Sequence, residues 1–165
     1  MPAAIDFIFD FGSPNAYLAW KVMPDITRRT GAAVNLIPCL LGGIFKATNN
    51  RSPVQAFGEV KGKLAYEQLE TRRFVAKHGL SAYRSNPHFP VNTLLIMRGL
   101  VAARRQGLSE PYLEAVAAAM WEAGEKMDDP EVVARGVFGI PTFFVGDEMF
   151  FGKDRLGQVE EAVVS

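Results

Sequence analysis

A β-α-β pattern at the start of the chain is the feature that most restricts its fold. Ile5 to Phe11 reads IDFIFDF, which is nearly all apolar and typical of a buried strand. Asn15 to Arg29 carries apolar residues near helical spacing, and Gly31 just beyond it is a common helix end. Ala33 to Cys39 predicts a second strand. This order indicates two parallel strands joined by a right-handed crossover.

The end of the chain is rich in predicted strands again. Phe143 to Val145 predicts a short buried strand, and Met149 to Phe151 predicts its partner. Gly146-Asp147 between them is a hairpin turn signal. A closing helix is expected from Asp154 to Val164. This part therefore has the order β-β-α.

The middle of the chain has a helical pattern instead. Phe45 to Pro53 predicts a polar loop, and Gly79 to Pro90 predicts a second loop. Ser109 is the expected N-cap of the last helix in this region. The predicted helices are Gln55 to His78, Val91 to Gln106 and Pro111 to Lys126.

The three parts together have the element order of an α/β, thioredoxin-like fold with an all-helical insertion between the β-α-β and β-β-α halves. We expect residues 1–44 and 134–165 to form the thioredoxin-like domain and residues 45–133 to form the helical insertion domain. A length of 165 residues is typical of one domain that carries an insertion.

Composition and charge exclude several classes of partner. Lys+Arg and Asp+Glu are both 18, so the net charge is zero, and we expect no nucleic acid and no membrane as partner. No apolar run reaches the roughly 18 residues of a membrane span, and the N-terminus lacks a signal-peptide pattern. We expect a cytoplasmic protein. Cys39 is the single cysteine, so a CxxC redox pair is impossible.

Ser13 lies where the first strand meets the first helix. The simplest interpretation is a helix N-cap followed by Pro14 at the first helical position. The functional interpretation is that thioredoxin-fold enzymes place a nucleophilic sulfur here, where amides and the helix dipole stabilise a thiolate. A Cys-Pro-x-Cys motif would put its cysteines at Ser13 and Ala16, and neither is a cysteine. We therefore expect a soluble thiol at this site, with the Ser13 hydroxyl donating to its sulfur.

Two segments near the end of the chain could hold the rest of such a thiol. Ile140-Pro141 is either an ordinary proline at a strand entrance or a cis bond that leaves the Ile140 backbone to pair with an extended peptide. Lys153-Asp154-Arg155 is either a charged first helical turn or the seat of a γ-glutamyl group.

Three motifs carry a resemblance to a known family. They are DFxSPxxYLA from Asp10 to Ala19, KLAY from Lys63 to Tyr66, and GVFGIPTFFVGDEMFFGKDRL from Gly136 to Leu156. The chain resembles the 2-hydroxychromene-2-carboxylate isomerases, a family close to kappa-class glutathione transferases and DsbA-like proteins. The resemblance implies a thioredoxin fold, glutathione as the cofactor, a small aromatic substrate and a homodimer.

The resemblance also implies roles for individual residues. Ser13 matches the serine beside the glutathione sulfur and is the expected catalytic residue. Asn50 matches a glutathione-binding asparagine, and Lys63 matches the lysine that meets the glycyl carboxylate. The remaining expected cofactor contacts are Ile140 and Pro141 at the cysteinyl unit, Asp154 at the γ-glutamyl end, and its neighbours Lys153 and Arg155. No metal site is expected, since His78 and His88 are separated, and both are expected to have a structural or surface role. Trp20 and Trp121 are expected to be packing residues.

The chain departs from the family between Val133 and Ala134, where the family usually has additional helices. It is either a short form or has residues missing from the sequence at this point. We expect missing residues, because a real deletion would have to reconnect distant flanks. It would also uncover apolar faces of the helix at Pro111 to Lys126.

The resemblance implies glutathione-dependent cis-trans isomerisation of aromatic unsaturated pyruvates. A thiolate that adds to the conjugated carbon turns a double bond into a rotatable single bond and is then released. The alternatives are a kappa-like glutathione transferase or peroxidase, in which glutathione is consumed, and a glutathione-binding module without turnover.

Overall fold

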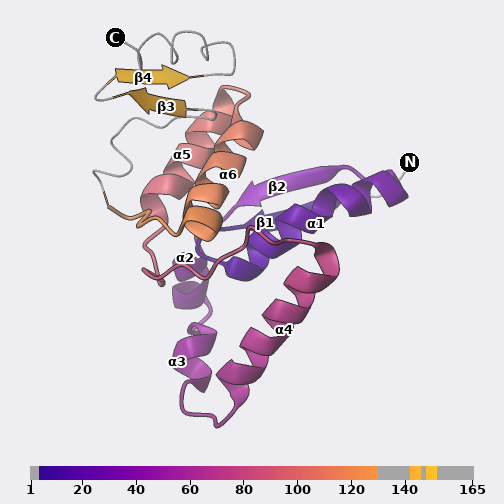
Figure 1. Ribbon diagram of the computed structural model, residues 1–165, viewed down its shortest axis with the longest axis vertical. Coiled ribbons are helices and arrows are strands. Elements are labelled where there is room, and N and C mark those ends of the chain that lie inside the picture. Colours follow the sequence, from indigo (N-terminus) through magenta and orange to yellow (C-terminus); the bar gives the residue numbers. More distant parts are fainter. Residues whose placement is uncertain (1–3, 130–141, 146–147, 152–165) are drawn as a thin grey trace. The chain divides into compact units, whose positions relative to one another are not determined.

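A computed structural model describes residues 4–129, 142–145 and 148–151 (Figure 1). The chain divides into two compact units, Met1–Ser85 and Asn86–Ser165. The first unit contains the strand–helix junction at Ser13, and the second contains a helical pair and a β-hairpin. The division predicted from the sequence, with residues 45–133 as the insertion, stays a prediction.

The predicted β-α-β unit is confirmed at the start of the first unit. It consists of β1 (Ile5–Phe9), α1 (Pro14–Thr30) and β2 (Val34–Pro38). The two strands are parallel neighbours, with register running from Ile5 opposite Val34 to Phe9 opposite Pro38. Helix α1 ends at Gly31, whose φ of 68° lies in the left-handed region that glycine adopts without steric cost.

One face of β1 carries the core of this unit. Phe9 is buried and meets the Phe11 ring edge-on at 5.0 Å, while Phe7 stacks on Trp20 of α1 at 6.4 Å. This contact confirms the packing role expected of Trp20. The expectation of a fully buried strand is wrong, because Ile8 on the other face is 59% exposed. Alternate residues of a strand point to opposite faces, and α1 packs on one of them.

The segment after β2 is more helical than the sequence predicts. Two short helices, α2 (Leu41–Ala47) and α3 (Pro53–Phe57), take the two ends of the predicted polar loop, while residues 48–52 between them are loop as predicted. The expected single helix from Gln55 to His78 is also wrong, because the chain breaks after α3 and resumes as α4 (Lys63–His78). Gly62, with a φ of 81°, is the left-handed residue that interrupts the helical path. Figure 1 shows α3 and α4 as separate helices joined by a loop.

The second unit contains the helices α5 (Leu94–Arg105) and α6 (Ser109–Ala118), followed by the π-helical turn η1 (Ala119–Ala123). The predicted helix from Pro111 to Lys126 therefore starts slightly earlier and ends earlier. Ser109 is the first helical residue rather than the N-cap, which is Leu108, and no side chain caps this end.

Asn86 explains why the helix stops. Its buried side chain donates to the carbonyl oxygens of Met120 and Glu125, both at 2.8 Å. Gly124 then turns the chain away with a φ of 75°. The bond to Met120 satisfies a carbonyl at the end of η1, whereas the Glu125 carbonyl also accepts from the Met127 N–H at 3.1 Å. The chain therefore leaves the helix at η1 rather than at Lys126.

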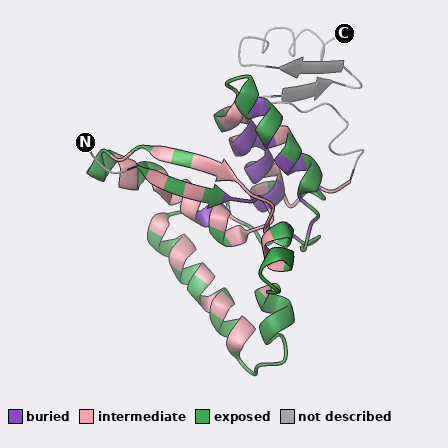
Figure 2. Cartoon of the chain, turned by 180° about the vertical axis from the view of Figure 1, so that it is seen from behind, coloured by how far each residue is buried: buried purple, intermediate pink, exposed green. Residues whose placement is uncertain are grey.

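Helices α5 and α6 contain the densest core in the described part of the chain, as Figure 2 shows by their purple segments. The largest buried side chains of this core are Ile96, Leu100 and Leu113 in the two helices, and Met120 and Trp121 in η1. By contrast, α4 has no buried residue. The packing role expected of Trp121 is confirmed, since only 2% of it is exposed.

The Tyr112 hydroxyl joins the two helices by donating to the Ile96 carbonyl at 3.0 Å. Its ring end lies directly against Gly99, where a Cβ atom would overlap the hydroxyl. Gly99 is therefore required here for close approach between helices, not for backbone flexibility.

The predicted hairpin is confirmed as β3 (Thr142–Val145) and β4 (Glu148–Phe151), which pair antiparallel. The expected turn at Gly146-Asp147, the closing helix from Asp154 to Val164 and the cis bond at Ile140-Pro141 lie outside the described residues. Among the residues that the structure describes, no helix is both long and apolar enough to cross a bilayer.

We expect Gly99→Ala to lower the free energy of unfolding by about 1–3 kcal/mol, because the new methyl group displaces Tyr112 from its hydrogen bond. The matched control is Gly42→Ala, since Gly42 is also helical and has open space around it. That variant should be neutral or stabilised by up to about 1 kcal/mol. Urea denaturation measures both, and equal stability of the two variants would contradict the packing role of Gly99.

Stability should also fall in strong alkali because of Tyr112. Burial raises the pKa of Tyr112 from 10.0 to about 12. A group with a raised folded-state pKa stabilises the fold below its unfolded pKa, and that contribution disappears as pH rises through the folded value. The difference in stability between the wild-type protein and Tyr112→Phe should therefore shrink between pH 10.0 and about 12. Parallel pH curves for the two proteins would refute this.

Candidate functional site

Ser13 is the N-cap of α1, as the simplest interpretation predicted. Its backbone is extended, with φ −107° and ψ 112°, and its Oγ accepts from the Ala16 N–H at 3.1 Å. A hydroxyl has one donor hydrogen and two acceptor lone pairs, so the bond from Ala16 leaves the hydrogen available. Capping and donation to an anion are therefore compatible roles for Ser13.

The helix behind Ser13 favours negative charge at this point. Helix α1 has 17 residues, no acidic residue in its first turn, and Arg28 and Arg29 in its last turn. The helix dipole places partial positive charge at the N-terminal end. The amides of the first turn of a helix have no acceptor within the helix. Pro14 has no N–H, but Asn15 lies in this first turn and its N–H can bind an anion. This end can therefore stabilise a thiolate.

Asp10 is a residue of this junction whose role the sequence analysis missed. It is 5% exposed, and its two carboxylate oxygens accept from the Gly12 N–H at 2.7 Å and the Leu41 N–H at 2.6 Å. An Asp two residues before a glycine at a strand end is a signal for an Asx-turn, and this could have identified the first bond. The bond to Leu41 spans 31 residues and required the structure.

Asn50 lies after α2, in the same unit as Ser13. Its N–H donates to the Phe45 carbonyl at 2.9 Å, and its side-chain oxygen accepts from the Arg51 N–H at 2.8 Å. The residue is exposed. The amide NH₂ can therefore donate to a ligand while the carbonyl oxygen holds the turn.

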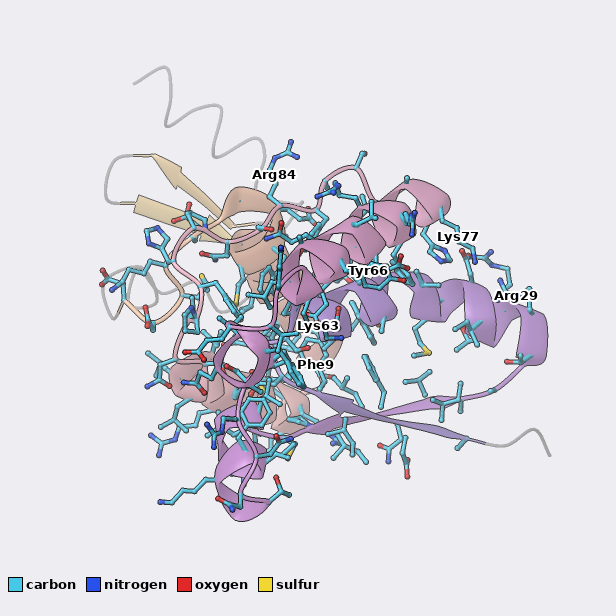
Figure 3. All side chains as sticks on the ribbon, turned by 90° about the horizontal axis from the view of Figure 1, so that it is seen from below. Phe9, Arg29, Lys63, Tyr66, Lys77 and Arg84 are labelled. Carbon is cyan, nitrogen blue, oxygen red and sulfur yellow. The ribbon has the colours of Figure 1, made fainter. Side chains whose placement is uncertain are left out.

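Lys63 is the first residue of α4, and Figure 3 shows it near one end of that helix, with Tyr66 beyond it. Its Nζ lies 3.3 Å from the Glu67 carboxylate and 5.5 Å from the centre of the Phe57 ring. Side-chain exposure of 42% makes the ion pair with Glu67 weak. A free carboxylate can therefore compete with Glu67 for this ammonium.

The other expected contacts are not placed by the structure. Ile140, Pro141, Lys153, Asp154 and Arg155 all lie outside the described residues. Ser13, Asn50 and Lys63 come from three different helical segments of the first unit. Of the expected site residues, the structure thus describes Ser13 before α1, Asn50 in the loop after α2 and Lys63 at the start of α4.

No cluster of His, Cys, Asp and Glu among the described residues could hold a metal ion. His78 lies 4.4 Å from the Phe74 ring centre, which supports the structural role expected of it. Cys39 follows β2, and its N–H donates to the Phe9 carbonyl at 3.0 Å. The single protein thiol therefore belongs to the strand pair and not to the N-terminus of α1. A thiolate at Ser13 must come from another molecule.

Comparison with known proteins supports the thioredoxin-like fold predicted from the sequence. A model of the DSBA-like thioredoxin domain matches residues 4–135 and 131–164. The chain is 28% identical to a 2-hydroxychromene-2-carboxylate isomerase of Sphingobium xenophagum, over 97% of each chain. It is 25% identical to the protein of the same name from Pseudomonas putida, over 96% of this chain and 93% of that one.

A solved structure of a 2-hydroxychromene-2-carboxylate isomerase is also similar. Its TM-score is 0.56 with 25% identity, over 96% of this chain and 93% of that chain. The expected α/β thioredoxin-like fold is thus confirmed.

The alignments also show where this chain is shorter. The match to the Sphingobium protein spans 197 positions, and 197 minus the 165 residues of this chain leaves at least 32 positions as gaps. The two family-model matches meet at residues 131–135, which is where the sequence predicts the departure. Val133 and Ala134 lie outside the described residues, so the expectation of missing residues at this point stays a prediction, as does the alternative of a short form.

The family model therefore covers both strand-rich ends and the helical region between them, interrupted where this chain is short. Together with the β-α-β unit and the cysteine-free junction at Ser13, this shows that the chain belongs to the DSBA-like thioredoxin family.

Proposed function

We propose that this chain binds glutathione at the N-terminus of α1 and is an isomerase of the 2-hydroxychromene-2-carboxylate isomerase type. The observation that carries the proposal is Ser13, a capping serine where a redox member of the fold would have a cysteine. Similarity to isomerases along nearly the whole chain supports the reaction class. The substrates would be small aromatic unsaturated pyruvates, and the working form would be a homodimer.

Bound glutathione would supply a thiolate nucleophile that adds to a conjugated carbon and is later expelled, so that the intervening bond can rotate. Ser13 donates its hydroxyl hydrogen to the sulfur while Oγ keeps its bond from the Ala16 N–H. The dipole of α1 lowers the pKa of a thiol at this position. The chain's own part in catalysis is therefore to hold the sulfur ionised and correctly placed.

The remaining contacts would orient the tripeptide. Asn50 donates its amide hydrogens, and Lys63 exchanges Glu67 for the glycyl carboxylate. The Ile140 backbone before Pro141 would pair with the cysteinyl unit, and Asp154 would take the γ-glutamyl ammonium. Lys153 and Arg155 would flank that contact. These five roles rest on the resemblance of the Gly136 to Leu156 motif.

Glutathione should stabilise the folded protein by mass action and so raise its melting temperature. At a glutathione concentration 100 times its Kd, the free energy of unfolding should increase by about 2.7 kcal/mol. S-methylglutathione is the matched control, because it keeps the peptide contacts and loses the ionisable thiol. We expect it to bind more weakly, since it offers no negative charge to α1. Calorimetry that detects no binding at millimolar glutathione would overturn the proposed function.

Turnover separates the candidate activities. With an aromatic unsaturated pyruvate, an isomerase returns glutathione unchanged over many turnovers, and chromatography of the thiol measures this directly. Stoichiometric loss of glutathione would indicate the transferase or peroxidase instead. Binding without conversion of any substrate in the panel would indicate a binding module.

Ser13→Ala and Ser13→Gly separate the two roles of the hydroxyl. Alanine at an N-cap costs about 1 kcal/mol of stability, whereas glycine costs only a few tenths. Both variants lose the charge-assisted hydrogen bond, so both should slow turnover by roughly 10–150-fold, equivalent to about 1.5–3 kcal/mol.

The pH dependence of the rate should show in which direction Ser13 shifts the pKa of the bound thiol. Loss of the donor raises the pKa of the bound thiol, so less thiolate is present near neutral pH and part of the rate returns in alkali. Ultraviolet absorbance of the thiolate measures this shift. Thr30→Ala, at the opposite end of α1, is the control and should leave the rate unchanged. A Ser13→Gly enzyme with wild-type rate and wild-type thiolate absorbance would remove Ser13 from the mechanism.

A further inference from the structure

We propose that Asp10 is the positioning residue of the thiolate site, because its carboxylate joins the loop that carries Ser13 to the first residue of α2. The inference rests on the proposed function, since Ser13 is where the thiolate is placed. Asp10 itself touches neither substrate nor cofactor in this proposal. It acts on the reaction through the position of Ser13.

Two hydrogen bonds of Asp10 define the loop. Oδ1 accepts from the Gly12 N–H at 2.7 Å, and the Asp10 carbonyl accepts from the Ser13 N–H at 3.2 Å. The side chain and the backbone of one residue thus hold two successive amides just before α1. A serine hydroxyl moves with its backbone, so this turn sets where Oγ of Ser13 lies.

The second carboxylate oxygen reaches a different part of the chain. Oδ2 accepts from the N–H of Leu41 at 2.6 Å, and Leu41 is the first residue of α2. The N-cap residue of α2 is Leu40, and no side chain within that helix end makes a capping bond. Asp10, the residue that follows β1, therefore supplies the cap that the local sequence of α2 lacks.

The charge of Asp10 fits this role. A buried carboxylate is costly unless it accepts hydrogen bonds, and here each oxygen accepts a backbone amide at short distance. Helix α2 leads to Asn50, whose N–H bonds back to Phe45 of that helix. The buried Asp10 side chain thus connects the loop that carries Ser13, the proposed sulfur contact, with the helix that leads to Asn50, a proposed contact of the tripeptide.

Asp6 provides a contrast in the preceding strand, β1. It also makes a side-chain hydrogen bond, accepting from Asn35 of β2 at 3.0 Å, but this bond is exposed. It connects neither the Ser13 loop nor α2. Asp6→Asn is therefore the matched control for Asp10→Asn.

We expect Asp10→Asn to lose one of the two amide contacts, because an NH₂ group must face an N–H donor. In the glutathione-free protein, hydrogen exchange at the Gly12 or Leu41 amide should become faster. With glutathione, the pKa of the bound thiol should rise and kcat should fall by about 10–100-fold, because misplacing a catalytic group by about 1 Å can cost 10²-fold. The KM for the aromatic substrate should change little. Asp6→Asn should change none of these.

Leu41→Pro tests the same contact without touching the carboxylate. Proline is tolerated at the first position of a helix, and the backbone of Leu40, with φ −70° and ψ 113°, is compatible with a following proline. The substitution removes the N–H that Oδ2 accepts. It should lower kcat and raise the thiol pKa, as Asp10→Asn does. Leu41→Ala, which removes the side chain but keeps the N–H, should have little effect on either.

The outcomes separate this inference from the proposed function. If both Asp10→Asn and Leu41→Pro lose stability but keep the wild-type kcat and thiol pKa, Asp10 is merely structural and the inference is overturned, while the proposed function stands. If Asp10→Asn fails to fold, Leu41→Pro and its alanine control decide the question. If the wild-type protein does not bind glutathione, both proposals fail, and calorimetry on that protein alone shows this.

Discussion

The parallel pairing of β1 (Ile5–Phe9) with β2 (Val34–Pro38) is the constraint on which the candidate site depends. Parallel strands end at the same edge, so the residues that follow them are brought together. The Cys39 N–H donates to the Phe9 carbonyl and so extends the pairing beyond β2. Just after both strands, the Leu41 N–H donates to the Asp10 carboxylate. A shift of one residue in register would turn the side chains of a strand to the opposite face and separate these partners.

The junction at Ser13 shows how one geometry can support both stability and chemistry. A helix N-cap needs an oxygen that accepts an amide, and a bound thiolate needs a donor near the positive end of a helix. The Ser13 hydroxyl makes the first of these bonds, and its separate donor hydrogen is compatible with the proposed second. The chain can therefore keep the fold of a redox domain without a cysteine at this position.

The second unit keeps a buried helical core although the match to the family model is interrupted at residues 131–135. A deletion in the helical region was expected to uncover apolar faces of the helix that begins near Pro111. In the described part of the chain, Leu113, Met120 and Trp121 are nevertheless at most 2% exposed. The helix ends early at the π-helical turn, where the Asn86 side chain donates to the Met120 carbonyl. The close fit of Tyr112 against Gly99 adds a direct contact between α5 and α6.

The sequence by itself determined the β-α-β unit, the terminal hairpin, the capping role of Ser13 and the lack of a protein thiol at the junction. These features depend on local patterns of polarity, on helix-capping residues and on residue identity, which are readable along the chain. Only the tertiary structure decided that Leu41 begins a helix, that Gly62 breaks one, and that Asp10 reaches Leu41. The α2 helix lacks a local cap, so its start depends on a carboxylate 31 residues earlier, and only folding brings the two together.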